Sequence, residues 1–172
     1  GFYQYASLGD FVWVDTNANG QQDADEVGIA DVTVTLIDAN GNDVGTTTTG
    51  ALGDYLFSNL IPGSYSVRFT TPDGYVATTM NTGDDNADSD PEEGETGSYT
   101  LASGESNMTV DAGFYQYASL GDFVWVDANA NGQQDAGESG LSDVVVNLLD
   151  ENDNIIATTT TSATGGYLFS NL

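Results

Sequence analysis

Apolar and polar residues alternate along several short stretches of the chain, which is the pattern of strands that bury one face. Residues 32–36 read Val-Thr-Val-Thr-Leu, and residues 64–70 alternate in the same way. No stretch of ten residues carries the 3.6-residue period of an amphipathic helix. The pattern therefore predicts an all-β fold, and short strands separated by turns are typical of a β-sandwich. Strands are predicted over residues 7–14, 32–36, 44–49, 55–57, 64–70, 97–102 and 107–115.

The sequence GFYQYASLGDFVWVD occurs twice, at residues 1–15 and 113–127. Residues 1–60 and 113–172 differ at only 16 of the 60 aligned positions, which indicates tandem modules. The junction between them contains no spacer rich in glycine, serine or proline, so we expect a stiff array. The predicted organisation is the last strand of a preceding repeat at residues 1–6, a complete repeat at 7–117 and a truncated second repeat at 118–172.

The twelve residues DTNANGQQDADE, at 15–26, have the spacing of an EF-hand calcium loop. A calcium ion takes about six to eight oxygens, and alternate side chains of a tight loop can supply them. Gly20 permits the sharp bend of such a loop. The same spacing recurs in DANANGQQDAGE at 127–138. The alternative is a polar Asn-Gly turn with incidental carboxylates. The predicted ligands are Asp15, Asn17, Asn19, the backbone carbonyl of Gln21, Asp23 and Glu26, and in the second loop Asp127, Asn129, Asn131, Gln133, Asp135 and Glu138.

The charge balance is extreme, because 27 acidic residues face one basic residue, Arg68, for a formal net charge of −26. This charge repels phosphate groups and anionic lipid, and therefore disfavours nucleic acid and membrane surfaces as partners. It also destabilises the compact state by self-repulsion, which bound divalent cations would offset. A disordered acidic tail is the alternative, but the aromatic residues, 10% of the chain, are spread through alternating patterns and favour a folded core.

The chain contains no histidine, cysteine or lysine. Histidine acid-base chemistry, thiolate or Schiff-base catalysis, disulfides and the usual zinc sites are therefore excluded. Carboxylate-only catalysis is the least favoured function. No apolar run is long enough to span a bilayer, so membrane insertion is not expected.

Other features allow two interpretations each. Trp13 and Trp125 either stack on sugars at the surface or belong to the core, and their place inside an apolar strand favours the core. Residues 84–95 hold seven acids, which form either a solvated loop or a second metal site. The Asn40-Gly41 step predicts the corner of a hairpin.

Three segments together carry a family resemblance: GDFVWVDTNANGQQDADEVGIADVTVTLID, GDYLFSNLIPGSYSVRF and NMTVDAGF. They resemble the B-type repeat of serine-aspartate-repeat surface proteins, an Sdr B-like module of the wider Cna-B group, over residues 7–113 and again over 119–172. The resemblance implies a transthyretin-like β-sandwich that binds Ca²⁺ through the loop and serves as a stalk in bacterial adhesins. Related pilin modules form an internal Lys-Asn cross-link, which this lysine-free chain cannot form.

The resemblance also implies further calcium sites in acidic turns. The matching residues here are Asp38, Asn40 and Asn42 in one turn, and Asp84, Asp85, Asp88 and Asp90 in the acidic run.

These observations predict a calcium-stiffened stalk repeat of an extracellular, cell-surface bacterial protein. Its partners would be neighbouring repeats of the same chain or identical chains, with a host or glycan ligand bound by other domains. One alternative is a subunit of an extracellular filament or surface layer, completed by strands from neighbouring chains. Another is a non-catalytic accessory module of a secreted polysaccharide-degrading enzyme.

Overall fold

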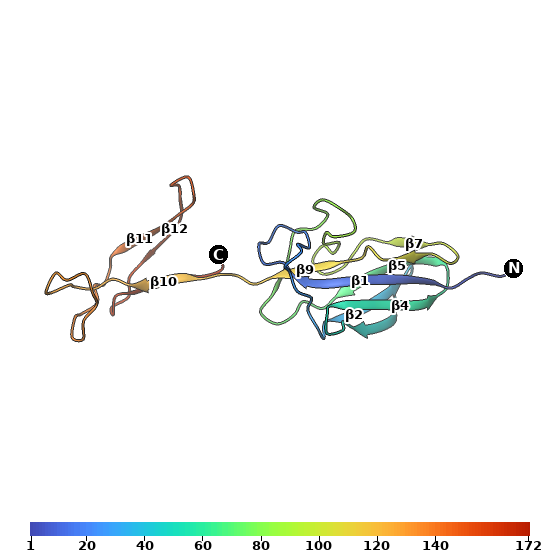
Figure 1. The fold of residues 1–172 in the computed structure, drawn as a ribbon, viewed down its shortest axis with the longest axis horizontal. Coiled ribbons are helices and arrows are strands. Elements are labelled where there is room, and N and C mark those ends of the chain that lie inside the picture. Colours follow the sequence, from blue (N-terminus) through green and yellow to red (C-terminus); the bar gives the residue numbers. More distant parts are fainter. The chain divides into compact units, whose positions relative to one another are not determined.

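The computed structural model describes residues Gly1–Leu172 and consists of strands and loops without a helix, which confirms the predicted all-β fold. The chain separates into two compact units, Gly1–Gln116 and Tyr117–Leu172 (Figure 1). The chain contains no helix, and therefore no helix that is long and apolar enough to cross a membrane.

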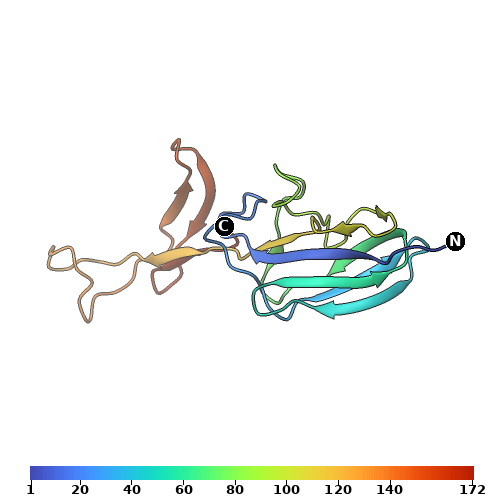
Figure 2. The same ribbon diagram turned by 45° about the vertical axis from the view of Figure 1, so that its right-hand side comes forward.

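The first unit is a sandwich of two sheets (Figures 1 and 2). One sheet has the strand order β4-β1-β9-β6, with β8 also paired to β1, and the other has the order β3-β2-β5-β7. The strands are β1 (Ala6–Val14), β2 (Thr33–Asp38), β3 (Asp43–Thr48), β4 (Asp54–Leu60), β5 (Gly63–Phe69), β6 (Val76–Ala77), β7 (Tyr99–Leu101), β8 (Ser106–Asn107) and β9 (Ala112–Tyr115).

Strand β1 is the centre of the first sheet. It pairs antiparallel with β4, where Leu8 lies opposite Phe57, and parallel with β9, where Val14 lies opposite Phe114. Leu8, Val12 and Phe114 face the other sheet and form one buried cluster with residues such as Val34. The two-residue period of these strands therefore places one apolar face of each sheet in a common core.

Trp13 is also fully buried, as predicted, but it is not part of that cluster. Successive side chains of a strand point to opposite faces, so Trp13 lies on the other side of β1 from Val12. A side chain at Gly113 would meet both the Trp13 ring and the methyl group of Thr78. The indole ring therefore packs against Gly113 of β9, which has no side chain.

The predicted strand over residues 107–115 is wrong in part, because the structure interrupts it between β8 and β9. There the N–H of Asp111 donates to the carboxylate of Asp90, and the carboxylate of Asp111 accepts the N–H of Phe11. Side-chain hydrogen bonds thus replace the regular ladder of the sheet. The predicted hairpin corner is confirmed, since Gly41 adopts φ of +81° between β2 and β3.

The second unit contains β10 (Leu120–Phe123) paired with β13 (Gly166–Phe169), and β11 (Val145–Leu149) paired with β12 (Ile155–Thr160). The pairing of Leu120 with Phe169 repeats that of Leu8 with Phe57 in the first unit. Unit 2 has no counterparts of β5 to β9, and Leu120 is half exposed whereas Leu8 is buried. The registers of the two repeats therefore agree, although their burial differs.

The N-terminal residues bear on the predicted repeat boundary. Ala6 lies in β1, opposite Leu60 of β4, and so belongs to the sandwich of unit 1. Phe2 is fully exposed, whereas the residue at its place in the repeat, Phe114, is buried in β9. Ala6 is therefore part of unit 1, and the assignment of residues 1–5 to a preceding repeat stays a prediction.

Candidate metal centre

The first predicted calcium loop begins where β1 ends, and its first ligand, Asp15, is fully buried. The N–H of Asp15 donates to the carbonyl of Phe114 in β9 (2.8 Å), which fixes the start of the loop on the sheet. Oδ2 of Asp15 accepts hydrogen bonds from the N–H of Gly20 (2.8 Å) and the hydroxyl of Thr78 (2.6 Å). Oδ1 accepts only a longer bond from the N–H of Asn19 (3.2 Å). One carboxylate oxygen is therefore held firmly, and the other is less engaged.

The last predicted ligand, Glu26, closes the loop. Its Oε1 accepts the N–H (2.6 Å) and the hydroxyl (3.0 Å) of Thr16, and its Oε2 accepts the N–H of Asp23 (3.0 Å). The side-chain amides of Asn17 and Asn19 both donate to Oδ2 of Asp23, at 2.8 and 3.0 Å. The side chains predicted as ligands are thus brought together in one hydrogen-bonded ring.

The loop also packs against the segment that follows β6. Gly20 has φ of +82°, and a side chain there would collide with the carbonyl of Thr79. The N–H of Ser89 donates to the carbonyl of Gly20 (3.2 Å), and the side-chain amide of Gln21 donates to the carbonyl of Thr82 (2.6 Å). Glycine is required here both for the left-handed backbone and for the close approach of this segment.

The second loop repeats the internal network. Asp127 accepts the N–H groups of Asn131 (3.1 Å) and Gly132 (2.8 Å), and Oε2 of Glu138 accepts the N–H of Asp135 (3.0 Å). The side-chain amide of Asn131 donates to Asp135 at 2.8 Å. Unit 2 contains no counterpart of residues 79–89, so the twelve-residue sequence itself specifies the loop geometry.

The chemistry of the loop fits a hard divalent cation. At its predicted ligand positions each loop offers three carboxylates, two asparagine side chains and a backbone carbonyl. All of these ligands present oxygen when the asparagine amides turn their carbonyl groups inward. No basic side chain neutralises them, because Arg68 is engaged with Glu95 (3.0 Å) and Asp43 (3.4 Å). The residues present therefore match the donor set that calcium prefers.

A second group of carboxylates lies in the acidic segment. One oxygen from each of Asp85, Asp88 and Asp90 lies within 4.8 Å of the others. Asp88 is 4% exposed, and its Oδ1 has no hydrogen-bond partner. Asp84 differs, because it accepts hydrogen bonds from the side-chain amide (2.7 Å) and the N–H (3.1 Å) of Asn86, which lower its pKa in that order of importance. Three of the four acids predicted in this segment are thus brought together, and Asp84 forms a local turn.

Asp111 adjoins this group and was missed by sequence reasoning. It is 1% exposed, its N–H donates to Oδ2 of Asp90 (2.6 Å), and its own Oδ2 is buried without a partner. Burial, and then the charges of Asp10 and Asp90, raise the pKa of Asp111 to about 8. Burial likewise raises the pKa of Asp90 to about 6, although Asp90 also accepts the hydroxyl of Tyr99 (2.8 Å). The one signal available beforehand was an acid inside the apolar run Val-Asp-Ala-Gly-Phe.

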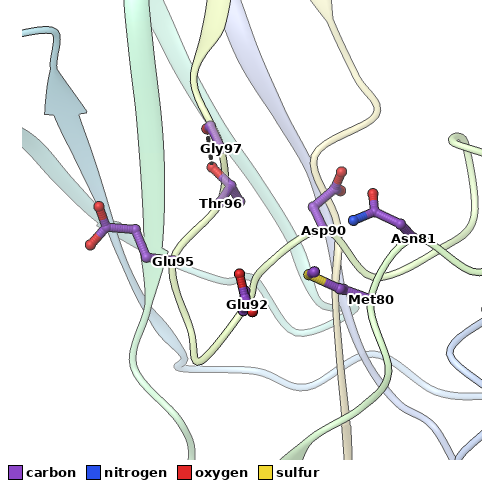
Figure 3. A pocket seen from close by; sticks show the side chains of 7 residues that line it. All are labelled: Met80, Asn81, Asp90, Glu92, Glu95, Thr96 and Gly97. Atoms are coloured by element: carbon purple, nitrogen blue, oxygen red, sulfur yellow. Dashed lines mark hydrogen bonds between the residues drawn. The ribbon is translucent and has the colours of Figure 1, made fainter.

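An open cavity of about 490 Å³ lies next to Asp90 (Figure 3). Figure 3 shows Asp90 and Asn81 pointing toward each other from neighbouring segments, whereas Glu95 points away. Glu95 is the partner of Arg68. The cavity is acidic, and its lining residues are Met80, Asn81, Asp90, Glu92, Glu95, Thr96 and Gly97.

The turn of Asp38, Asn40 and Asn42 is closed by its own hydrogen bonds. Oδ1 of Asp38 accepts the N–H groups of Asn40 (2.8 Å) and Asn42 (2.9 Å), and the bonds from Asn42, followed by those from Asn40, lower the pKa of Asp38 to about 2. Asp150 makes the same bonds in unit 2. These contacts close the β2–β3 hairpin. A metal site at Asp38, Asn40 and Asn42 stays a prediction.

Comparison with known proteins shows the family to which the chain belongs. The SdrD B-like domain matches residues 6–114 and 118–172. The chain is 50% identical over 175 residues to serine-aspartate repeat-containing protein F of Staphylococcus epidermidis. It is 48% identical over 176 residues to serine-aspartate repeat-containing protein E of Staphylococcus aureus. Both alignments cover the whole chain, but the chain spans only 10% and 15% of these relatives.

The solved structure of the Bacillus anthracis TIE protein aligns with 97% of this chain, at 16% identity and a TM-score of 0.49. The alignment covers 26% of the TIE protein chain. The family resemblance expected from the sequence motifs is confirmed by the domain match and the staphylococcal relatives. The chain therefore belongs to the SdrD B-like domain family.

Proposed function

We propose that this chain is a stalk segment of a bacterial cell-surface protein, and that calcium bound to its twelve-residue loops stabilises and stiffens it. The observation that carries the proposal is the hydrogen-bonded ring of oxygen-bearing side chains that recurs in both repeats. Family membership supports a structural rather than a catalytic role, because the relatives are serine-aspartate repeat-containing proteins.

In unit 1 the ion would be held by Asp15, Asn17, Asn19, the carbonyl of Gln21, Asp23 and Glu26, and in unit 2 by the equivalent residues of the second loop. Bound calcium supplies positive charge where the side chains supply none. The loop joins β1 to β9 through Asp15 and Phe114 and contacts residues 79–89, so its occupancy would tighten one whole end of the sandwich. A ligand that binds only the folded state at a hundred times its Kd adds about 2.7 kcal/mol of stability.

The acidic segment would provide a second cation site in unit 1. Asp85, Asp88 and Asp90 are the ligands proposed there, and the unpartnered oxygens of Asp88 and Asp111 support it. A buried carboxylate oxygen without a hydrogen bond calls for a partner, which in this segment would be a cation.

Burial of Trp13 counts against the accessory-module alternative. A ring that stacks on a sugar must offer one face to solvent, and the Trp13 side chain has no exposed surface. The filament alternative has no such observation against it, and it shares the calcium chemistry of the stalk.

Calorimetric unfolding of the chain in calcium and in chelator tests the proposal. We expect a higher melting temperature in millimolar calcium, with magnesium giving a smaller rise because it demands a tighter octahedral shell. Equal melting temperatures in calcium and chelator would contradict it.

A further inference from the structure

Thr78 contributes the shortest hydrogen bond to Asp15, although it lies 63 positions away in the chain. It follows β6, and its N–H donates to the carbonyl of Gly113 (3.0 Å), which extends the pairing of β6 with β9. Thr78 is 7% exposed. Its methyl group packs against Gly113, where an added Cβ would lie 2.7 Å from that methyl group. The hydroxyl is therefore fixed in place by the sheet, independently of the loop.

The hydroxyl acts on one oxygen of the carboxylate. Together, Thr78 (2.6 Å) and Gly20 (2.8 Å) occupy Oδ2 of Asp15, while Oδ1 keeps a single long bond from Asn19 (3.2 Å). Hydrogen bonds to a carboxylate are short and strong, and two of them on one oxygen resist rotation of the group. Oδ1 is thereby left as the oxygen available to an ion.

The second loop lacks this contact. Oδ2 of Asp127 accepts the N–H of Gly132 (2.8 Å) and Oδ1 accepts that of Asn131 (3.1 Å), both from the loop itself. The loops share their ligand residues, but the carboxylate of Asp127 has no donor equivalent to the Thr78 hydroxyl. The second loop therefore serves as an internal reference for the first.

We propose that Thr78 is a positioning residue for the first calcium loop, and that its hydroxyl holds Asp15 so that Oδ1 faces the ion. The inference rests on the proposed calcium binding. Partners that orient a metal ligand in this way are worth roughly ten- to a hundredfold in metal affinity. The first loop should therefore lose about tenfold or more in calcium affinity when the hydroxyl is removed, while the second loop is unaffected.

The test uses the full chain with Trp125→Phe, so that Trp13, two residues before Asp15, is the one emitting tryptophan. Calcium is titrated into this protein, and into the same protein carrying Thr78→Val or Thr78→Ser. Thr96→Val is the matched control, because Thr96 is equally buried but bonds to the backbone of Val67 and Gly97. Unfolding in chelator is measured for each, so that stability and affinity are separated.

We expect Thr78→Val to raise the calcium Kd at Trp13 about tenfold or more, and Thr78→Ser to stay close to the parent. Thr96→Val should leave the Kd unchanged even where it lowers stability in chelator. An unchanged Kd in Thr78→Val, or equal losses in the valine and serine variants, would overturn the inference while leaving calcium binding intact. Absence of calcium binding in the parent would overturn the proposed function and this inference with it.

Discussion

The backbone N–H of Asp111 donates to Oδ2 of Asp90 at 2.6 Å, and this bond holds two buried carboxylates side by side. The pKa of Asp90 is raised to about 6 by burial, and that of Asp111 to about 8 by burial and by the charges of Asp10 and Asp90. The folded state therefore holds these groups in protonated form at a pH where the unfolded chain has released the protons. A cation bound between Asp90 and Asp111 would allow both carboxylates to ionise in the folded state.

A pH dependence follows for the metal-free protein. Below the ordinary value of 3.8 the two acids are protonated in both states, so they cost no stability. Between 3.8 and the raised pKa values, the folded state binds more protons than the unfolded state, and the free energy of unfolding falls as the pH rises. In urea unfolding with chelator, the free energy of unfolding should therefore fall as the pH rises from about 4. The fall due to Asp90 should continue to about pH 6, and the fall due to Asp111 to about pH 8.

Asp111→Asn serves as the control for that dependence. Asparagine keeps an oxygen for the N–H of Phe11 but carries no charge, so the variant should be more stable than the parent in chelator at pH 8. Its stability should also change less between pH 6 and 8. The same slope in both proteins would show that Asp111 does not titrate in this range.

Phe114 and Phe2 occupy the same place in the repeat but differ in burial. Phe114→Ala should lower the free energy of unfolding by about 3–5 kcal/mol, because it removes a buried ring and leaves a cavity beside β1. Phe2→Ala removes an exposed ring and should change it by less than about 0.5 kcal/mol. Denaturant unfolding of the two variants in calcium gives both values, and equal losses would contradict the burial assigned to β9.

Gly28 lies against the β3–β4 turn, where an added Cβ would collide with the carbonyl of Leu52. Gly28→Ala should therefore cost about 1–3 kcal/mol, because backbone atoms must shift to admit the methyl group. An added Cβ at Gly97 would have no atom within 4 Å, so Gly97→Ala should be nearly neutral. Thermal unfolding distinguishes the two variants, and a neutral Gly28→Ala would contradict the close approach of Gly28 to the carbonyl of Leu52.

Most strands of unit 1 could be predicted, because the two-residue alternation of apolar and polar side chains is apparent from residues adjacent in the sequence. The hydrogen bonds of the twelve-residue loops are also local, since they join residues within twelve positions. Calcium binding by these loops stays a prediction. Strand β6 escaped prediction because two residues, Val76 and Ala77, carry no period. Their pairing with β9 is a product of the tertiary fold.

The parts of the site that sequence reasoning missed depend on distant contacts. Thr78 is one threonine among many until the fold places its hydroxyl 2.6 Å from Oδ2 of Asp15. Asp111 directly precedes β9, and only the fold shows that its Oδ2 is buried without a hydrogen-bond partner. The turn of Asp38 is a case in which local sequence is ambiguous. Its Asp-x-Asn-x-Asn spacing suits both a metal site and a hydrogen-bonded hairpin. Composition alone does not separate those two outcomes.

Calorimetric titration of calcium into the metal-free chain tests the central claim most directly, when it is done on the parent and on the double variant Glu26→Gln/Glu138→Gln. These substitutions remove the charge that closes each loop but keep the side-chain length. The parent should bind calcium at both loops, and the double variant should lose those two binding events while remaining folded in the same buffer. Identical titrations for parent and variant would contradict calcium binding at the twelve-residue loops.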